Sequence, residues 1–475
     1  MTISEYHEKV RNKEVSVTDT VASYVDTIEK RNGELNAFLQ VHKEEAFARA
    51  RALDDDGEQR GLLWGVPVAV KDNILVQDKP TTAASKILEN YTATYDATVV
   101  KKLNEQGAVI VGKTNMDEFA MGSSNETSAF GAVKNPHDIS RVPGGSSGGS
   151  AAVVAADMAM AALGTDTGGS IRQPASLCGV VGLKPTYGAV SRYGVIALSS
   201  SLDQVGPLAS SVQDAARVFE AIAGHDPFDA TSAKRNMDGV SNFDNFETKQ
   251  LTIGVPKEYF IDGIQKEVKE SAERAVQKLE KDGFKVREVS LPHTSYALSV
   301  YYIIMPAEAS ANLARYDGIR YARLDDLKGE DLSLFELYEK QRGQGFGEEA
   351  RRRILLGTFV LSSGYYDAYY SKAQKVRRLI CQDFEKVFDD GVDVLATPVT
   401  PTTAFKIGEK ANDPLAMYLS DIFTIPANMA GLPALSLPTG EKDENDLPIG
   451  FQLIGQHFEE KKILALGDYF QTQLA

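Results

Sequence analysis

The chain has 475 residues, 43% hydrophobic and 25% charged, which is the composition of an ordinary globular protein. A formal net charge of −15, without any long lysine or arginine tract, argues against nucleic-acid binding by the chain alone. Its two cysteines, Cys178 and Cys381, have neither disulfide-framework nor zinc-site spacing. Because the N-terminus lacks an apolar signal core and no apolar stretch could span a bilayer, we expect a cytoplasmic protein.

The N-terminal residues 1–60 are predicted to form a helical layer. Apolar side chains recur at helical spacing in the charged segment 2–51, as expected for amphipathic helices. Thr18 and Asp19 are both candidate N-caps of one of these helices, because their side-chain oxygens can accept hydrogen bonds from first-turn N–H groups.

The segment 61–210 has the pattern of an α/β sheet and is predicted to be the core of the domain. The short apolar runs VPVAV at 66–70 and AVIVG at 108–112 enclose the helical segment DATVVKKLNEQG at 96–107. Strand, helix and strand in this order are typical of a sheet with crossover helices. Lys71 is expected to end the first of these strands.

The second half of the chain repeats this order of elements. LTIGVP at 251–256 and FKVREVSL at 284–291 are predicted strands, and the charged segment 264–283 is the helix between them. The polar stretch 227–250 is predicted to be a surface connection, and GEKDENDLPIG at 440–450 an exposed turn between two strands. We therefore predict one large α/β domain across all 475 residues, with a central mixed β-sheet flanked by helices.

Two serine clusters flanked by glycine are the main chemical signal. The first, PGGSSGGS at 143–150, matches G-x-S-x-G around Ser146. A nucleophile elbow needs a strand directly before it, however, and residues 135–143 are polar and broken by proline. A histidine-based triad is not supported either. The downstream histidines lie in polar or turn-like surroundings and are predicted to be surface residues: His225, His293 and His457.

The second cluster has a better context for a nucleophile. The apolar residues of MAMAALGTDTGG at 158–169 lead into a glycine turn, and SIRQPASLCG at 170–179 could begin a helix with Ser170 at its start. N–H groups at a helix start lack intrahelical partners and can hold a developing oxyanion. The alternative is a plain turn with a serine N-cap.

Lys71 completes a set of residues for amide chemistry without histidine. A serine nucleophile needs a base, and a lysine serves when burial favours its neutral amine. Lys71 and the segments GGSSGGS and GGSIR together resemble the amidase signature family, and the separations between Lys71, Ser146 and Ser170 agree with that family. The resemblance implies the amidase signature fold.

The same resemblance implies a Ser-Ser-Lys triad. Ser170 would be the nucleophile, Ser146 the bridging serine on a cis peptide, and Lys71 the ultimate base. Ser147 would support the same loop, and no metal site is expected. The backbone N–H groups that would hold the oxyanion belong to Thr167, Gly168 and Gly169.

Further segments resemble one branch of this family, the glutaminase subunits of tRNA-dependent amidotransferases. These segments are 113–131, 182–207, 308–321, 345–370 and the C-terminal IPANMAGLPALSLP. The branch hydrolyses L-glutamine to glutamate and ammonia. One departure is Ala189, where the branch carries an arginine. It lies outside the triad and concerns a local salt bridge.

Free glutamine makes two demands on a pocket, since its ammonium and its carboxylate both need partners. By resemblance Arg353 would bind the α-carboxylate and Asp421 the α-amino group, while Tyr302 would line the same pocket. The register within Arg351–Arg353 is open, because any of these arginines could instead lie on a solvated helix face.

The resemblance also implies partner subunits. A B subunit would bind tRNA and use ATP and magnesium to activate the glutamyl group, and a small C subunit would join the two in a heterotrimer. The charge of −15 fits this division, since the tRNA contacts would fall mainly to the B subunit. The chain has no G-x-x-x-x-G-K-[ST] loop, so we expect no nucleotide or other cofactor in it.

Three alternatives stay open at this point. The first is a stand-alone amidase of the same family that acts on another amide. The second is a non-catalytic assembly subunit, against which the intact Lys71, Ser146 and Ser170 argue. The third is a cysteine hydrolase using Cys178, which LCGVVG disfavours because it indicates a buried residue without an activating base at recognisable spacing.

Overall fold

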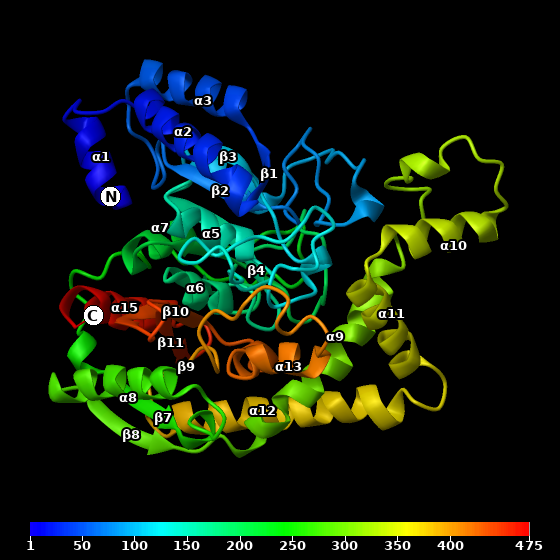
Figure 1. Cartoon of the computed structure of the whole chain (residues 1–475). Coiled ribbons are helices and arrows are strands. Elements are labelled where there is room, and N and C mark those ends of the chain that lie inside the picture. The colour runs from blue at the N-terminus through cyan, green and yellow to red at the C-terminus, as the bar shows by residue number, and fades with distance from the viewer. Residues whose placement is uncertain (475) are drawn as a thin grey trace.

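A computed structural model describes residues 1–474, which form an 11-stranded mixed sheet flanked by helices (Figure 1). The strand order is β1-β3-β2-β4-β6-β5-β10-β11-β9-β7-β8. The strands are β1 (Phe38–Val41), β2 (Pro67–Lys71), β3 (Val109–Thr114), β4 (Ala161–Asp166), β5 (Val181–Lys184), β6 (Gln204–Ala209), β7 (Thr252–Pro256), β8 (Lys285–Val289), β9 (Val394–Pro398), β10 (Ala434–Lys442) and β11 (Pro448–Gly455). The predicted α/β fold with a central mixed sheet is confirmed. Ala475, the last residue of the predicted domain, lies outside the described residues.

Helices connect the strands and cover the sheet (Figure 1). They are α1 (Ile3–Arg11), α2 (Val17–Leu35), α3 (Lys43–Asp56), α4 (Thr98–Glu105), α5 (Gly148–Ala155), α6 (Arg172–Cys178), α7 (Val212–Ile222), α8 (Lys266–Lys281), α9 (Ala297–Leu313), α10 (Leu334–Gly345), α11 (Glu348–Leu361), α12 (Lys372–Asp389), α13 (Pro414–Tyr418), α14 (Ile425–Ala430) and α15 (Glu460–Gln473). No helix within residues 1–474 is both long and apolar enough to cross a membrane.

The N-terminal layer contains α1, α2 and α3, together with one strand that the sequence pattern did not indicate. That strand, β1, pairs antiparallel with β3 at the edge of the sheet. The predicted N-caps Thr18 and Asp19 are wrong, because α2 begins two residues earlier than Asp19 and is capped by Ser16. The Ser16 hydroxyl accepts from the Asp19 N–H at 2.9 Å, so Asp19 is the donor in this cap rather than its acceptor.

The predicted order of elements in both halves is confirmed. In the first half β2, α4 and β3 follow one another, and β2 ends at Lys71 as expected. In the second half β7, α8 and β8 do the same, and residues 443–447 join the antiparallel strands β10 and β11. The stretch 227–250 holds no strand and is mostly exposed, although Met237 and Val240 pack against the core.

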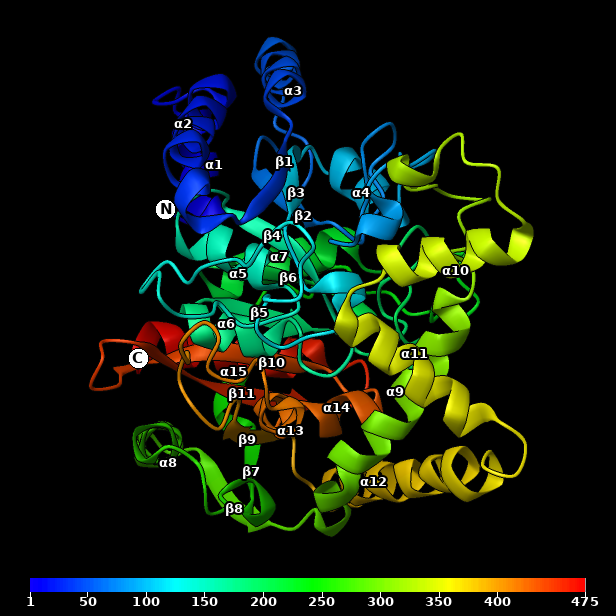
Figure 2. The ribbon, with the colours of Figure 1, turned by 45° about the vertical axis from the view of Figure 1, so that its right-hand side comes forward.

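Two features of this fold place the residues of the site. Strands β2 and β4 are parallel neighbours, so their carboxyl ends meet at one edge of the sheet and bring Lys71 and Asp166 to the same region. Helices α9 and α11 pack side by side beyond that edge, while α10 projects from the body (Figure 2). Arg353 lies on α11.

Candidate active site

Lys71 is completely buried and contacts three hydroxyl groups. Its Nζ lies 2.8 Å from Oγ of Ser146, 2.8 Å from Oγ of Ser147 and 2.9 Å from Oγ1 of Thr165. Thr165 belongs to β4, and both serines lie in the loop before α5. The structure therefore brings the predicted base and the predicted bridging serine into direct contact.

The surroundings of Lys71 disfavour its charged form. Burial lowers the pKa of Lys71 to about 7, although Asp117, Asp166 and Asp203 act in the opposite direction. A substantial part of the amine is therefore neutral near pH 7. Only this neutral form has a lone pair with which to accept a proton.

The hydrogen-bond pattern also suits a neutral amine, which has two N–H donors and one lone pair for its three hydroxyl neighbours. Ser147 donates its own hydrogen to the Thr165 carbonyl at 3.1 Å, so toward Lys71 its oxygen acts as an acceptor. The lone pair of Lys71 then remains for the Ser146 or the Thr165 hydroxyl. A proton path from Ser146 to Lys71 is compatible with these three hydroxyl contacts.

The loop that carries Ser146 is shaped by glycine. A cis peptide bond joins Gly145 to Ser146, as the family resemblance implied. Gly144 has a φ of 84°, and a Cβ at this position would meet the Gln173 side chain. Gln173 Oε1 in turn accepts from the Gly145 N–H at 2.9 Å, which attaches the loop to helix α6.

Ser170 lies between β4 and α6 and is 8% exposed. Its carbonyl accepts from the Ser147 N–H at 3.1 Å, which joins the two serine clusters. The N-cap position of α6 is Ile171, and no side chain caps this helix. The alternative of a turn in which Ser170 serves as an N-cap is therefore wrong.

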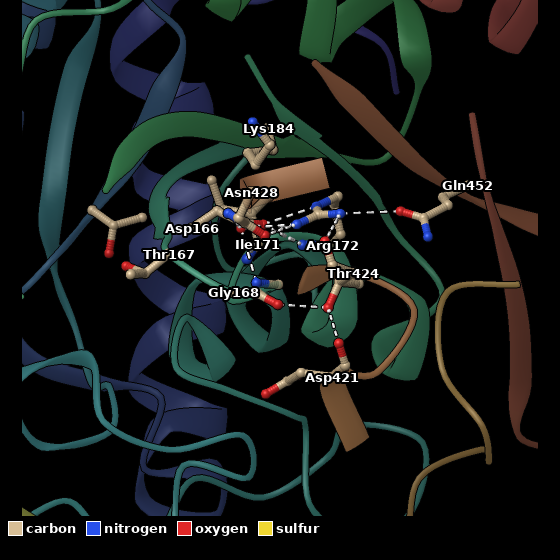
Figure 3. Close-up of polar contacts among 12 residues, drawn as sticks. Asp166, Thr167, Gly168, Ile171, Arg172, Lys184, Asp421, Thr424, Asn428 and Gln452 are labelled. Atoms are coloured by element: carbon tan, nitrogen blue, oxygen red, sulfur yellow. Dashed lines mark hydrogen bonds and ion pairs between the residues drawn. The ribbon is translucent and has the colours of Figure 1, made fainter. Parts of the chain in front are cut away.

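Asp166 and Arg172 organise the loop that holds Ser170 (Figure 3). Asp166 Oδ1 accepts from the Gly169 N–H at 2.9 Å, and Oδ2 accepts from the Ile171 N–H at 3.2 Å. Arg172 binds both carboxylate oxygens, with Nη2–Oδ1 at 3.0 Å and Nε–Oδ2 at 3.1 Å. Both side chains are fully buried, so each needs the other to offset the cost of burying its charge.

The three predicted oxyanion donors are not equivalent in this loop. The Gly169 N–H is already bound by Asp166, whereas no acceptor is found within residues 1–474 for the N–H groups of Thr167 and Gly168. The Gly168 carbonyl accepts from Thr424 Oγ1 at 2.6 Å, which fixes the orientation of the loop. Thr167 and Gly168 are thus the two predicted donors whose N–H groups are left for a substrate oxygen.

A cavity of about 230 Å³ lies beside this region and is lined in part by Ser123, Arg353 and Tyr418. The Ser123 carbonyl accepts from Gln173 Nε2 at 2.9 Å. Gln173 also binds the loop of Ser146, so a single side chain connects the cavity wall to the serine–lysine cluster. The volume suits a small polar molecule rather than a polymer.

Two of the three arginines Arg351–Arg353, namely Arg352 and Arg353, line the cavity, and they differ in burial. Arg351 is exposed, and Arg352 is partly exposed and pairs with Glu348 at 2.9 Å. Arg353 is only 4% exposed and lines the cavity. Burial therefore favours Arg353 over its two neighbours, and its role toward the substrate carboxylate stays a prediction.

Asp421 and Tyr302 do not line the cavity themselves, but each contacts a residue that does. Asp421 Oδ2 accepts from the hydroxyl of Ser123, and its Oδ1 has no partner in the described part of the chain. Burial raises the pKa of Asp421 to about 7. Tyr302 stacks on Tyr418, which itself lines the cavity, with 3.9 Å between the ring centroids.

The residues considered for other mechanisms lie elsewhere. His225 is exposed, His293 pairs with Asp383 at 2.9 Å, and His457 binds the Ala430 carbonyl at 2.9 Å. None of these contacts involves the serine–lysine cluster. Ala189, the departure from the family branch, is buried, and its carbonyl accepts from the Gly224 N–H.

Cys178 is buried at the end of α6, and its thiol donates to the Pro143 carbonyl at 3.3 Å. Burial raises the pKa of this thiol well above its usual range, so a reactive thiolate is disfavoured. Within residues 1–474 no group of three or more histidine, cysteine, aspartate or glutamate side chains is arranged to hold a metal ion.

Several residues of the site were not predicted from the sequence. Thr165, Asp166 and Arg172 stand within or next to the GTDTGGSIR segment, so their proximity to Ser170 could have suggested a supporting role. Glu349 and Tyr418 had no such signal, because only the packing of α11 against the segment of α13 brings them together.

A buried serine–lysine cluster at the edge of an α/β sheet defines a class of hydrolases that cleave amides without histidine. Residues 19–464 match the family described as Amidase, and the chain belongs to this family. It is 55% identical, over 99% of its length and 96% of the relative's, to the A subunit of glutamyl-tRNA(Gln) amidotransferase from Carboxydothermus hydrogenoformans.

Solved structures agree with this family. The A subunit of glutamyl-tRNA(Gln) amidotransferase from Thermotoga maritima is 45% identical with a TM-score of 0.82, covering 100% of this chain and 95% of that one. A peptide amidase from Stenotrophomonas maltophilia is 30% identical with a TM-score of 0.83, covering 100% and 97%. The fold is therefore common to proteins whose names refer to different amides.

Proposed function

We propose that this chain is the glutaminase subunit of a tRNA-dependent amidotransferase, in which it hydrolyses L-glutamine to supply ammonia. The observation that carries the chemistry is the buried Lys71 amine, whose pKa burial lowers to about 7, at 2.8 Å from the Ser146 hydroxyl. The identity of 55% to the A subunit of a glutamyl-tRNA(Gln) amidotransferase supports the link to the tRNA-dependent reaction.

In the proposed acylation step, neutral Lys71 accepts the proton of Ser146 while Ser146 accepts the proton of Ser170. Ser170 Oγ forms a bond to the amide carbon of glutamine, and the N–H groups of Thr167 and Gly168 stabilise the resulting oxyanion. The carbon–nitrogen bond then breaks, and ammonia leaves with the proton returned through Ser146. Water cleaves the acyl-enzyme along the same proton path and releases glutamate.

Glutamine recognition is assigned to the far end of the cavity. The planar guanidinium of Arg353 would bind the α-carboxylate, and Asp421, whose Oδ1 lacks a partner within residues 1–474, would bind the α-ammonium. Tyr302 supports this end of the pocket through its stack on Tyr418. Bound ammonium would favour the ionised form of Asp421, which burial alone disfavours.

The remaining steps would belong to partner subunits. We assign tRNA binding and the ATP- and magnesium-dependent activation of the glutamyl group to a B subunit, and the joining of the assembly to a small C subunit. Ammonia from this chain would convert Glu-tRNA(Gln), and where the partner selects it Asp-tRNA(Asn), to the amide form. The acidic charge of −15 supports the assignment of most tRNA contacts to a partner.

The experiment that tests this function is ammonia release from L-glutamine by the full chain, purified with any partners that accompany it, beside the Ser170→Ala variant. Turnover that is lost only in the variant would establish both the glutaminase activity and its nucleophile. If the unmodified protein cleaves other amides but not glutamine, the stand-alone amidase is the correct function instead.

A further inference from the structure

Glu349 lies one helical turn before Arg353 on α11 and takes no part in the reaction proposed above. Its Oε1 accepts from Arg353 Nε at 2.6 Å and from the Tyr418 hydroxyl at 2.9 Å. Its Oε2 accepts from Arg352 Nη1. One carboxylate thus holds donors from α11 and from α13, the two elements that form this wall of the cavity.

Glu349 binds the Arg353 guanidinium through Nε, which leaves the edge formed by Nη1 and Nη2 without a carboxylate partner. Nη1 donates to the sulfur of Met305 at 3.5 Å, and no hydrogen bond from Nη2 to an acceptor is found among residues 1–474. The edge formed by Nη1 and Nη2 has the geometry that binds a carboxylate through two parallel hydrogen bonds. Because Arg353 lines the cavity, this edge is the one left for a substrate carboxylate.

Two aromatic rings define the position of the same guanidinium. Its Cζ lies 5.0 Å from the centroid of the Tyr302 ring and 4.9 Å from that of Tyr418, within the range of cation–π attraction. Since the Tyr418 hydroxyl also binds Glu349, this carboxylate orients both the arginine and one of its rings.

We propose that Glu349 is a positioning residue for glutamine recognition, which holds Arg353 and Tyr418 so that the Nη1–Nη2 edge of Arg353 faces the substrate α-carboxylate. The inference rests on the proposed glutaminase function. Without the carboxylate, Arg353 regains rotamer freedom that substrate binding must then remove. The α-carboxylate keeps its charge and position while the distant amide is cleaved. Loss of Glu349 therefore weakens the binding of the ground state and of the transition state equally, so KM for glutamine rises while kcat stays the same.

The test compares kcat and KM for L-glutamine in the unmodified full chain with its co-purifying partners, in Glu349→Gln and in Glu385→Gln. Glu385 is a matched control, because it forms an ion pair with Arg378 at 2.6 Å on α12, away from the cavity lining. We expect Glu349→Gln to raise KM about tenfold with little change in kcat. Glu385→Gln should leave both constants unchanged.

Two further measurements separate positioning from a general loss of structure. For 4-aminobutanamide, which is glutamine without its α-carboxylate, kcat/KM should be the same in Glu349→Gln as in the unmodified chain. In an Arg353→Ala background, Glu349→Gln should add no further rise in KM, because the residue through which it acts is absent.

The proposal is overturned if KM for glutamine is unchanged in Glu349→Gln, if both substrates lose activity equally, or if the two substitutions are additive. These outcomes require that the unmodified chain turns over glutamine. If it does not, the proposed function fails first and this inference fails with it.

Discussion

The basicity of the Lys71 amine is set by its surroundings in the fold. An ammonium group removed from water loses solvation, and three hydroxyl oxygens replace only part of it. Burial therefore lowers the pKa of Lys71 to about 7, close to the pH at which a base is most effective. The nearby Asp117, Asp166 and Asp203 limit this shift, so the amine retains enough basicity to take a proton from serine.

Glutamine turnover should depend on pH with the sign set by this lysine. Below its pKa of about 7 Lys71 is protonated and cannot accept a proton, so kcat at saturating glutamine, where bound ammonium keeps Asp421 ionised, should fall about tenfold for each pH unit and reach a plateau above neutrality. Lys71→Met should lower turnover by about a hundredfold or more on that plateau. Ammonia release measured from acid to mildly alkaline pH checks both points, and a flat profile across neutrality would contradict the role of Lys71.

At the scale of elements, the packing of α11 against α9 decides where Arg353 lies. The two helices approach closely at Gly357, where an added Cβ would lie 1.8 Å from the Pro306 carbonyl oxygen. Such a distance cannot be relieved by a side-chain rotation, because the neighbour is backbone. Glycine at this position is therefore needed for the close approach of the helices.

Gly357→Ala should force α11 away from α9. We expect a loss of about 1–3 kcal/mol in the free energy of unfolding and a higher KM for glutamine, since Arg353 lies one turn earlier on the displaced helix. Gly343→Ala on α10 is the matched control, because nothing lies within 4 Å of its added Cβ. It should leave KM unchanged and stabilise the protein by up to about 1 kcal/mol. Denaturant unfolding combined with glutamine kinetics distinguishes the two variants, and equal behaviour would refute the packing argument.

At the scale of the whole molecule, the net charge of −15 argues against direct tRNA binding by this chain, although its proposed role is in a tRNA-dependent reaction. Binding to a phosphate backbone draws most of its free energy from lysine and arginine contacts that release counterions. A strongly acidic chain gains little of this free energy and repels the polyanion at long range.

The isolated chain should therefore bind tRNA only weakly, whereas its assembly with a basic partner should bind tightly and with a strong dependence on salt. Gel-shift titration of labelled tRNA with the chain alone and with the co-purified assembly measures this difference. The same affinity in both preparations would show that this chain carries a tRNA site of its own.

The sequence by itself was sufficient for the α/β class and for two strand–helix–strand units of the fold. Apolar periodicity indicated β2, α4 and β3, and again β7, α8 and β8, because the interior of a sheet demands apolar residues in runs of strand length. Family resemblance then supplied the proposed roles of Lys71, Ser146 and Ser170. The sequence pattern did not indicate β1, because this short strand is defined by its pairing with the distant strand β3. It also did not identify the Ser16 cap, because adjacent polar residues offer several capping side chains and the exact helix start decides among them.

Only the tertiary structure decided how these residues act on one another. The contact of Lys71 with three hydroxyl groups and the position of Arg353 beside the cavity both require segments distant in sequence to meet. Glu349 and Tyr418 are 69 residues apart and share one hydrogen bond. Periodicity constrains which face of each element is buried, but the pKa of a lysine and the open edge of an arginine depend on which neighbours the packed fold places beside them.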